Sequence, residues 1–116
     1  MIFLRNLIAA SFCFAALVFA IASAKAQPRS DTAKAAIYRV FGANGPKAYA
    51  VAYCESRLSI WARNSSGHLG LFQQSQGSRE TYYHPTRDGY WWGWWAQVRS
   101  AHRQFVAEGW SPWECA

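Results

Sequence analysis

The sequence predicts a single α+β domain that is predominantly α-helical and closed by one disulfide bond. Apolar residues recur at intervals of three and four in three segments, near 33–41, 46–55 and 90–107, and this is the period of an amphipathic helix. A short apolar segment at 70–74 supplies the remaining element, as a stub of strand or as the start of a helix. A length of 116 residues is typical of one domain.

Residues 1–26 are expected to form a secretory signal peptide. Arg5 gives a basic start, residues 7–22 are almost entirely apolar, and Ala24-Lys25-Ala26 resembles a cleavage site. An uncleaved membrane anchor is the alternative, because the apolar run lies near the lower length limit for a spanning helix. Both interpretations predict export to a secreted, periplasmic or cell-wall location. Cleavage leaves a mature domain at 27–116, which meets the membrane only during passage.

Cys54 and Cys115 form the predicted disulfide. Cys13 lies in the apolar leader and is lost on cleavage, and the two remaining cysteines are expected to pair in an oxidising compartment. Two free thiols are the alternative. Closing a loop of this size stabilises a fold by roughly 4 kcal/mol on entropic grounds, which is a large share for a small domain.

The charge of the mature chain limits its partners. Beyond residue 27 there are ten Lys and Arg residues against six Asp and Glu residues, a net charge of +4, which favours cell-wall polyanions, anionic lipid or nucleic acid. The basic residues form no stripe and no nucleic-acid-binding motif is present, so nucleic acid is not expected. His68, His84 and His102 lack a metal-ligand spacing, so neither a metal nor another cofactor is expected.

Glu55 occupies an unusual position on the second predicted helix. The first helix, capped by Asp31, is expected to stop at Gly42, and Pro46 suits the start of the second. Glu55 then shares a face with the apolar residues Ala48, Val51 and Ala52. An acid held against apolar surface favours its protonated form, because desolvation penalises the charge. The alternative is a frayed helix end with a solvated Glu55.

The segments between the helices are expected to be irregular. Residues 64–67 have the composition of a turn, and Gly70 suggests a close approach of the backbone to another backbone or to a ligand. Residues 75–89 are predicted to form a loop that exposes Tyr82 and Tyr83. In the last helix, which ends at Gly109, some indoles are expected in the core. Others are expected at the surface, where they can stack on sugars or contact a protein or membrane.

Two spaced motifs connect these observations to a family. Glu55-Ser56, the small-residue segment 62–67 and Gly70-Leu71-Phe72-Gln73 follow one another with the order and spacing of soluble lytic transglycosylases, and the chain resembles that family from about Ile37 onwards. Its ending, Gly109 to Cys115, is similar to that of small secreted members. The Cys-Glu-Ser opening also resembles resuscitation-promoting factors. Ser59-Ile60 stands where the family usually has Asn-Pro, and Trp94-Trp95 replaces an asparagine that often begins the last helix.

The resemblance implies a lysozyme-like fold and a monomeric enzyme that acts on peptidoglycan glycan strands. Such an enzyme cleaves the β-1,4 bond between N-acetylmuramic acid and N-acetylglucosamine and leaves a 1,6-anhydro end, with Glu55 as its only acid/base. The resemblance assigns substrate binding to Ser56, Asn64, Gly70, Leu71, Phe72 and Gln73, with Ser56 and Gln73 at positions that hold the acid and the substrate in place. Tyr82 and Tyr83 are further candidates for stacking on sugar.

Three alternatives remain at this point. A hydrolase of the same fold needs a second carboxylate, and the downstream loop acids Glu80 and Asp88 lie in no motif. A catalytically silent, glycan-binding protein is favoured by the tryptophan-rich segment. A membrane-active cationic protein is favoured by the charge and the tryptophans together.

Overall fold

The described part of the chain, residues 32–116 in a computed structural model, is predominantly helical as predicted. The predicted signal peptide lies outside these residues. The elements are α2 (Ala33–Phe41), the 3-10 helix η1 (Gly42–Asn44), α3 (Gly45–Ser56), α4 (Gln76–Tyr82), α5 (Pro85–Asp88) and α6 (Trp94–Glu108). Within this range, every helix is too short or too polar to cross a membrane.

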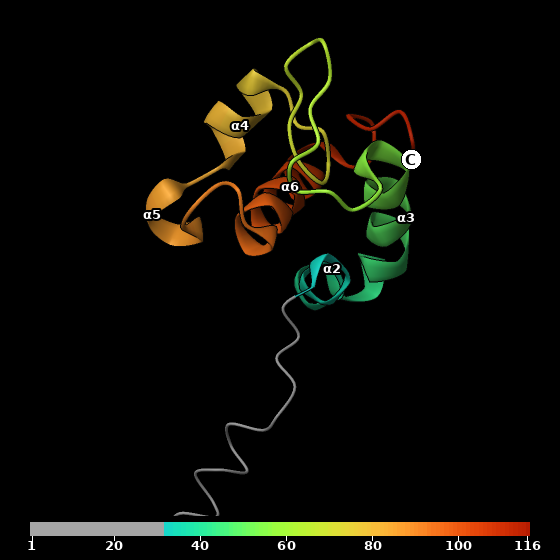
Figure 1. The fold of residues 1–116 in the computed structure, drawn as a ribbon. Coiled ribbons are helices and arrows are strands. Elements are labelled where there is room, and N and C mark those ends of the chain that lie inside the picture. Colours follow the sequence, from blue (N-terminus) through green and yellow to red (C-terminus); the bar gives the residue numbers. More distant parts are fainter. Residues whose placement is uncertain (1–31) are drawn as a thin grey trace, which may run out of the picture.

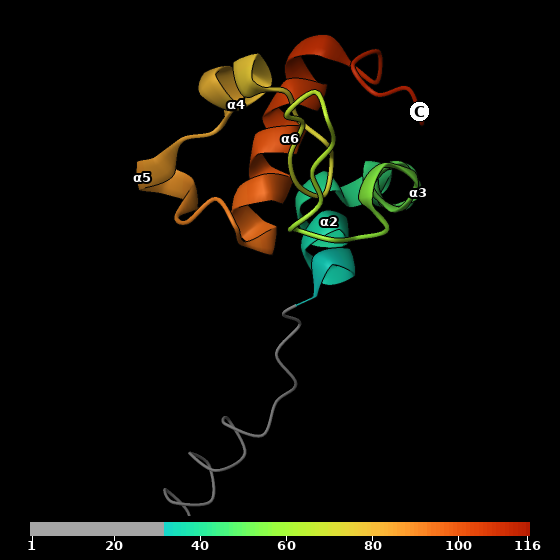
Figure 2. The ribbon, with the colours of Figure 1, turned by 45° about the horizontal axis from the view of Figure 1, so that its top comes forward.

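The strand content of the described residues is smaller than the α+β class suggests. It consists of two isolated bridges, which pair Leu69 with Arg63 and with Gln74. These bridges lie in the loop between α3 and α4, residues 57–75, and hold it together as a narrow finger. Figures 1 and 2 show this finger in yellow-green, between α3 and α4.

Helices α2 and α3 pack against each other through their apolar faces. Thr32 caps α2 by accepting a hydrogen bond from the backbone N–H of Ala35 at 3.1 Å, one residue after the predicted cap at Asp31. Gly42 ends the helix with a φ of 56°, a value that glycine adopts without steric cost. The buried residues of α2 are Ala33, Ala36, Ile37 and Phe41, and the apolar ones of α3 include Ala48, Val51 and Ala52.

Helix α6 forms the centre of the domain. In Figure 1, α4 and α5 lie on one side of it and α3 on the other. Val98 is fully buried, while Trp95 and Phe105 are partly buried against the core. The helix begins at Trp94 rather than near Tyr90, because the residues before Gly93 form a turn.

In the tryptophan-rich turn, the half-buried ring of Trp92 packs against an exposed indole. The ring of Trp92 stacks on that of Trp61 at 5.3 Å, and Trp61 is 61% exposed. The guanidinium of Arg63 lies 5.5 Å from the Trp92 ring, within cation–π distance. The indoles at positions 91, 92, 94 and 95 are all half-buried, so this segment does not divide into core and exposed indoles as expected.

The prediction of an irregular loop over residues 75–89 is wrong. This segment contains α4 and α5, which are too short to show helical periodicity in sequence. The hydroxyl of Ser75 caps α4 by accepting a hydrogen bond from the N–H of Ser78 at 3.1 Å, and Pro85 occupies the first turn of α5. Tyr82 and Tyr83 are half-buried rather than exposed.

An ion pair joins α5 to α6. The carboxylate of buried Asp88 accepts two hydrogen bonds from the guanidinium of Arg103, both at 2.6 Å, and one from the N–H of His84 at 2.9 Å. Burial raises the pKa of Asp88, but the hydrogen bonds from Arg103 and His84 outweigh burial, so the pKa lies below its usual value. Asp88 therefore has a structural role.

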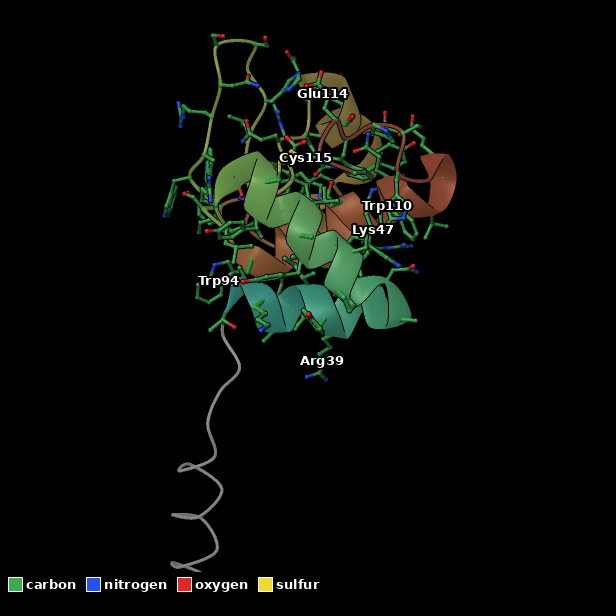
Figure 3. All side chains as sticks on the ribbon, turned by 90° about the vertical axis from the view of Figure 1, so that its right-hand side faces the viewer. Arg39, Lys47, Trp94, Trp110, Glu114 and Cys115 are labelled. Atoms are coloured by element: carbon green, nitrogen blue, oxygen red, sulfur yellow. A yellow bond between two sulfur atoms is a disulfide. The ribbon has the colours of Figure 1, made fainter. Side chains whose placement is uncertain are left out.

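The segment after α6 folds back across the domain. The ring of Trp110 lies 4.3 Å from that of Phe105, and the ammonium of Lys47 lies 5.2 Å from the Trp110 ring (Figure 3). The predicted disulfide between Cys54 and Cys115 is confirmed, with a Cα–Cα distance of 6.0 Å. Residues 110–115 are thereby held against the end of α3.

Candidate functional site

Glu55 lies at the edge of the buried face of α3. Ser56, rather than Glu55, continues that face, since Ser56 is 9% exposed and Glu55 is half-buried. The helix does not fray at this point, because both residues belong to α3. It ends where Arg57 and Leu58 adopt φ values of 55° and 62°, in the left-handed region. The turn leaves Glu55 facing out of the core.

Three side chains from different parts of the chain hold the backbone of segment 70–73. The hydroxyl of Ser56 donates to the carbonyl oxygen of Leu71 at 2.8 Å, and the indole N–H of Trp113 donates to that of Phe72 at 2.8 Å. The side-chain oxygen of Gln97 accepts from the N–H of Leu71, also at 2.8 Å. All these contacts are buried, so the segment is fixed on the domain.

Gly70 is required by the close approach of Gln97. Its φ is 81°, and a Cβ at this position would lie 2.4 Å from the Oε1 of Gln97. The predicted close approach therefore exists, and its partner is a side-chain amide. The same amide donates to the carbonyl oxygen of Ile60 at 3.0 Å. Gln97 thus connects α6 to two points of the finger, Ile60 and Leu71.

A polar cavity of about 330 Å³ lies beside Glu55. Its walls come from the end of α3, the finger, α4, α6 and the C-terminal segment. Its volume is at the small end of the range of roughly 300–1,000 Å³ for ligand pockets. The residues that line it are Glu55, Asn64, Ser66, His68, Gln73, Gln74, Ser75, Ser78, Gln104, Pro112, Trp113 and Glu114.

The cavity contains a second carboxylate that the sequence analysis missed. Glu114 lines it together with Glu55. Each glutamate is the neighbour of a cysteine in the chain, so the Cys54–Cys115 bridge brings the two acids to the same cavity. The sequence did hold a signal for this second carboxylate, because Glu55 follows one cysteine of the predicted disulfide and Glu114 precedes the other. Lys and Arg are absent from the lining residues.

The floor of the cavity is a chain of amide and hydroxyl groups. The Nε2 of Gln74 donates to the Oε1 of Gln104 at 2.9 Å, and the Nε2 of Gln104 donates to the hydroxyl of Ser78 at 2.9 Å. The hydroxyl of Ser75 donates to the same oxygen at 3.0 Å. Gln74 and Gln104 are 3% and 5% exposed. This floor was also missed, because its members are up to 30 residues apart in sequence.

The residues predicted to bind substrate fall into three groups. Asn64 and Gln73 line the cavity with Glu55. Ser56, Gly70, Leu71 and Phe72 are buried behind it and support the wall. Tyr82 and Tyr83 do not line it.

Two of these placements depend on local hydrogen bonds. The Oδ1 of Asn64 accepts from the N–H groups of Ser66 and His68 at 2.9 and 3.0 Å, which confirms the predicted turn. Only the Nδ2 group of Asn64 remains for a ligand. Gln73 has a φ of 47°, and its Nε2 donates to the carbonyl oxygen of Gly70 at 3.0 Å.

Tyr83 lies at a second hollow, beside the opposite part of α4. Its ring meets that of Trp91 edge to face at 5.1 Å. Arg79, Glu80 and Pro85 complete the lining of this open, mostly apolar hollow. Tyr83 and Trp91 therefore line this hollow and not the polar cavity.

No protein-family model, curated protein or solved structure matches this chain. Among the described residues, no cluster of three or more His, Cys, Asp or Glu side chains is arranged to hold a metal ion.

Proposed function

We propose that the chain has a lysozyme-like fold and is a peptidoglycan lytic transglycosylase with Glu55 as its acid and base. One observation carries the proposal. Glu55 and the segment that ends at Gln73, which the family resemblance pairs in sequence, meet at one cavity. The cavity is lined mainly by amide and hydroxyl groups, which are the groups that bind the hydroxyl and acetamido groups of a glycan strand.

The proposed reaction begins with protonation of the glycosidic oxygen. The protonated carboxyl of Glu55 donates its proton to the oxygen between N-acetylmuramic acid and N-acetylglucosamine. The bond from C1 to that oxygen breaks, and its electron pair stays on the oxygen. The acetamido group of the substrate stabilises the positive charge at C1. Glu55 is half-buried and lines the cavity, where a substrate can reach it.

The second step closes the anhydro ring. The ionised Glu55 takes the proton of the C6 hydroxyl, and O6 forms a bond to C1. The carboxyl group is then protonated again, and no water has been consumed. A single acid/base residue is therefore sufficient for the whole cycle.

Digestion of purified peptidoglycan by residues 27–116 tests this proposal. Mass analysis is expected to find muropeptides with 1,6-anhydro ends. Glu55→Gln should keep the fold and lose activity by roughly 10²- to 10⁴-fold, the usual contribution of a general acid/base. Glu80→Gln is the matched control, because Glu80 is exposed and outside the polar cavity. A Glu55→Gln protein that still releases fragments would refute the role of Glu55.

Hydrolysis is the second candidate, and the position of Glu114 favours it. Hydrolases use two carboxyl groups about 5–5.5 Å apart for retention or roughly 6.5–9.5 Å apart for inversion. Glu55 and Glu114 line the same cavity, so a second carboxylate is available to activate water. The hydrolytic product is heavier than the anhydro product by one water, and the same mass analysis distinguishes them.

A further inference from the structure

A buried side-chain oxygen on the cavity floor has no hydrogen-bond partner. Gln74 lines the cavity and is 3% exposed, and its Oε1 is buried and unpaired within residues 32–116. A buried acceptor without a partner is costly, and native proteins nearly always supply one. At the wall of a cavity, the missing partner can come from a bound molecule.

The surrounding network leaves the oxygen of the Gln74 amide, rather than its nitrogen, without a partner. Its Nε2 donates to Gln104, and Gln104 donates onward to Ser78 at 2.9 Å in each case. The Nε2 of Gln74 donates toward α6 and the Nε2 of Gln104 donates toward α4. The Oε1 of Gln74 is therefore left as an acceptor without a donor. A ligand group at this position must therefore be a hydrogen-bond donor.

The charges of the cavity restrict the donor further. Glu55 and Glu114 line the same space, and its lining includes neither lysine nor arginine. An anionic ligand group would approach two carboxylates and an unpaired carbonyl oxygen. The cavity therefore disfavours a carboxylate or phosphate, although the mature chain is basic as a whole.

We propose that Gln74 forms a specificity subsite that binds a hydrogen-bond donor of a saccharide through its Oε1. The donor is the N–H of an acetamido group or the O–H of a hydroxyl group. The inference rests on the proposed function only in taking the ligand to be a saccharide. Gln74 is a binding residue here, and the reaction at Glu55 does not require it to transfer a proton.

Nuclear magnetic resonance of the Glu55→Gln protein tests the contact directly. Chitotetraose offers acetamido groups, and cellotetraose offers hydroxyl groups in their place. Titration with chitotetraose is expected to shift the side-chain NH₂ signals of Gln74 and Gln104. The NH₂ signal of Gln97, which is buried in the core behind segment 70–73, should stay in place. An equal response to cellotetraose assigns the donor to a hydroxyl, and a response to chitotetraose alone assigns it to the acetamido N–H.

A substitution measures the strength of the contact. In the same Glu55→Gln background, Gln74→Met should weaken binding of the responding tetrasaccharide by roughly 3- to 10-fold, as expected for one hydrogen bond. Gln76→Met is the matched control, because Gln76 is exposed, bonds to Glu80 and lies outside the cavity. Circular dichroism checks the fold of both variants. The titration of the NH₂ signals is done with Gln74 intact. It therefore still tests the contact if Gln74→Met fails to fold.

Three results would overturn the subsite: no binding of either tetrasaccharide, binding without a response at Gln74, or unchanged affinity in a folded Gln74→Met protein. Failure of the proposed function is recognised separately. If the unsubstituted protein releases no fragments from peptidoglycan while chitotetraose still shifts Gln74, the subsite stands and the enzymatic proposal fails.

Discussion

The hydroxyl of Ser56 donates to the carbonyl oxygen of Leu71 across 2.8 Å and shares its proton with the carbonyl oxygen of Ala52 at 3.0 Å. Ser56 is the immediate neighbour of Glu55, and Leu71 belongs to the segment that supplies Gln73 to the cavity. One buried hydroxyl therefore sets the distance between the acid and the opposite wall. Ser56 was predicted to bind substrate, and in the structure it lies buried behind the cavity.

Ser56→Ala is expected to lower the free energy of unfolding by about 1–3 kcal/mol, because it leaves the Leu71 oxygen buried and unpaired. Urea denaturation measures the change. Ser65→Ala is the control, since Ser65 is exposed on the finger, and it should leave the midpoint unchanged. A Ser56→Ala protein as stable as the parent would show that the bond contributes nothing net.

Glu114→Gln separates the two candidate reactions. Under transglycosylation Glu114 takes no proton, so peptidoglycan cleavage should remain within a few-fold of the parent and the products should keep their anhydro ends. Under hydrolysis, loss of the second carboxylate should reduce the rate by roughly 10²-fold or more. Fragment release and product mass are measured beside Glu108→Gln, an exposed acid outside the cavity.

Removal of the disulfide should destabilise the domain by up to about 4 kcal/mol, because a bridge across 61 residues restricts the unfolded chain. Cys54→Ser, Cys115→Ser and the double variant should lose equal stability, since each removes the same bridge. Denaturant titration under oxidising conditions measures this. A double variant much less stable than either single variant would point to packing losses at the cysteines instead.

Acid should weaken the α5–α6 junction. The pKa of Asp88 is lower in the folded protein than its usual value of about 3.9. Its contribution to stability is therefore complete above about pH 4 and is lost as the pH falls through the lower, folded-state value. Asp88→Asn should cost about 2–3 kcal/mol at pH 7, below the range of about 3–5 kcal/mol for a fully buried pair, because Arg103 is 27% exposed.

Thermal unfolding between pH 2 and pH 7 tests this assignment. The difference between the parent and Asp88→Asn should shrink at the acid end, while Glu80→Gln should follow the parent throughout. A difference that stays constant with pH would mean that the charge of Asp88 does not stabilise the junction.

The sequence predicted those parts of the fold that depend on local patterns. The extent of α2 followed from its apolar spacing and Gly42, and the disulfide followed from the count of cysteines outside the leader. Helices α4 and α5 were missed, because seven and four residues are too few for a periodic stripe. Their local signals were the capping Ser75 and Pro85.

The candidate site was predicted only in part, because its remaining members meet through tertiary structure. Glu55 and Gln73 belong to recognisable motifs, and both line the cavity. Glu114 reaches it through the path of the C-terminal segment, and Gln74 finds Gln104 only when α6 packs behind the finger. Tyr82 and Tyr83 were predicted to be exposed on a loop, whereas they are half-buried at the end of α4 and do not line the cavity.

The Cys54–Cys115 bridge and any molecule held across the cavity are thermodynamically linked. The bridge fixes the wall that contains Trp113 and Glu114 relative to the end of α3. If closing the bridge strengthens the binding of a ligand between these walls by some factor, the bound ligand must favour the disulfide over two thiols by the same factor. Occupancy would then protect the covalent bond, and the concentration of reductant needed to open it would report how firmly the walls hold their ligand.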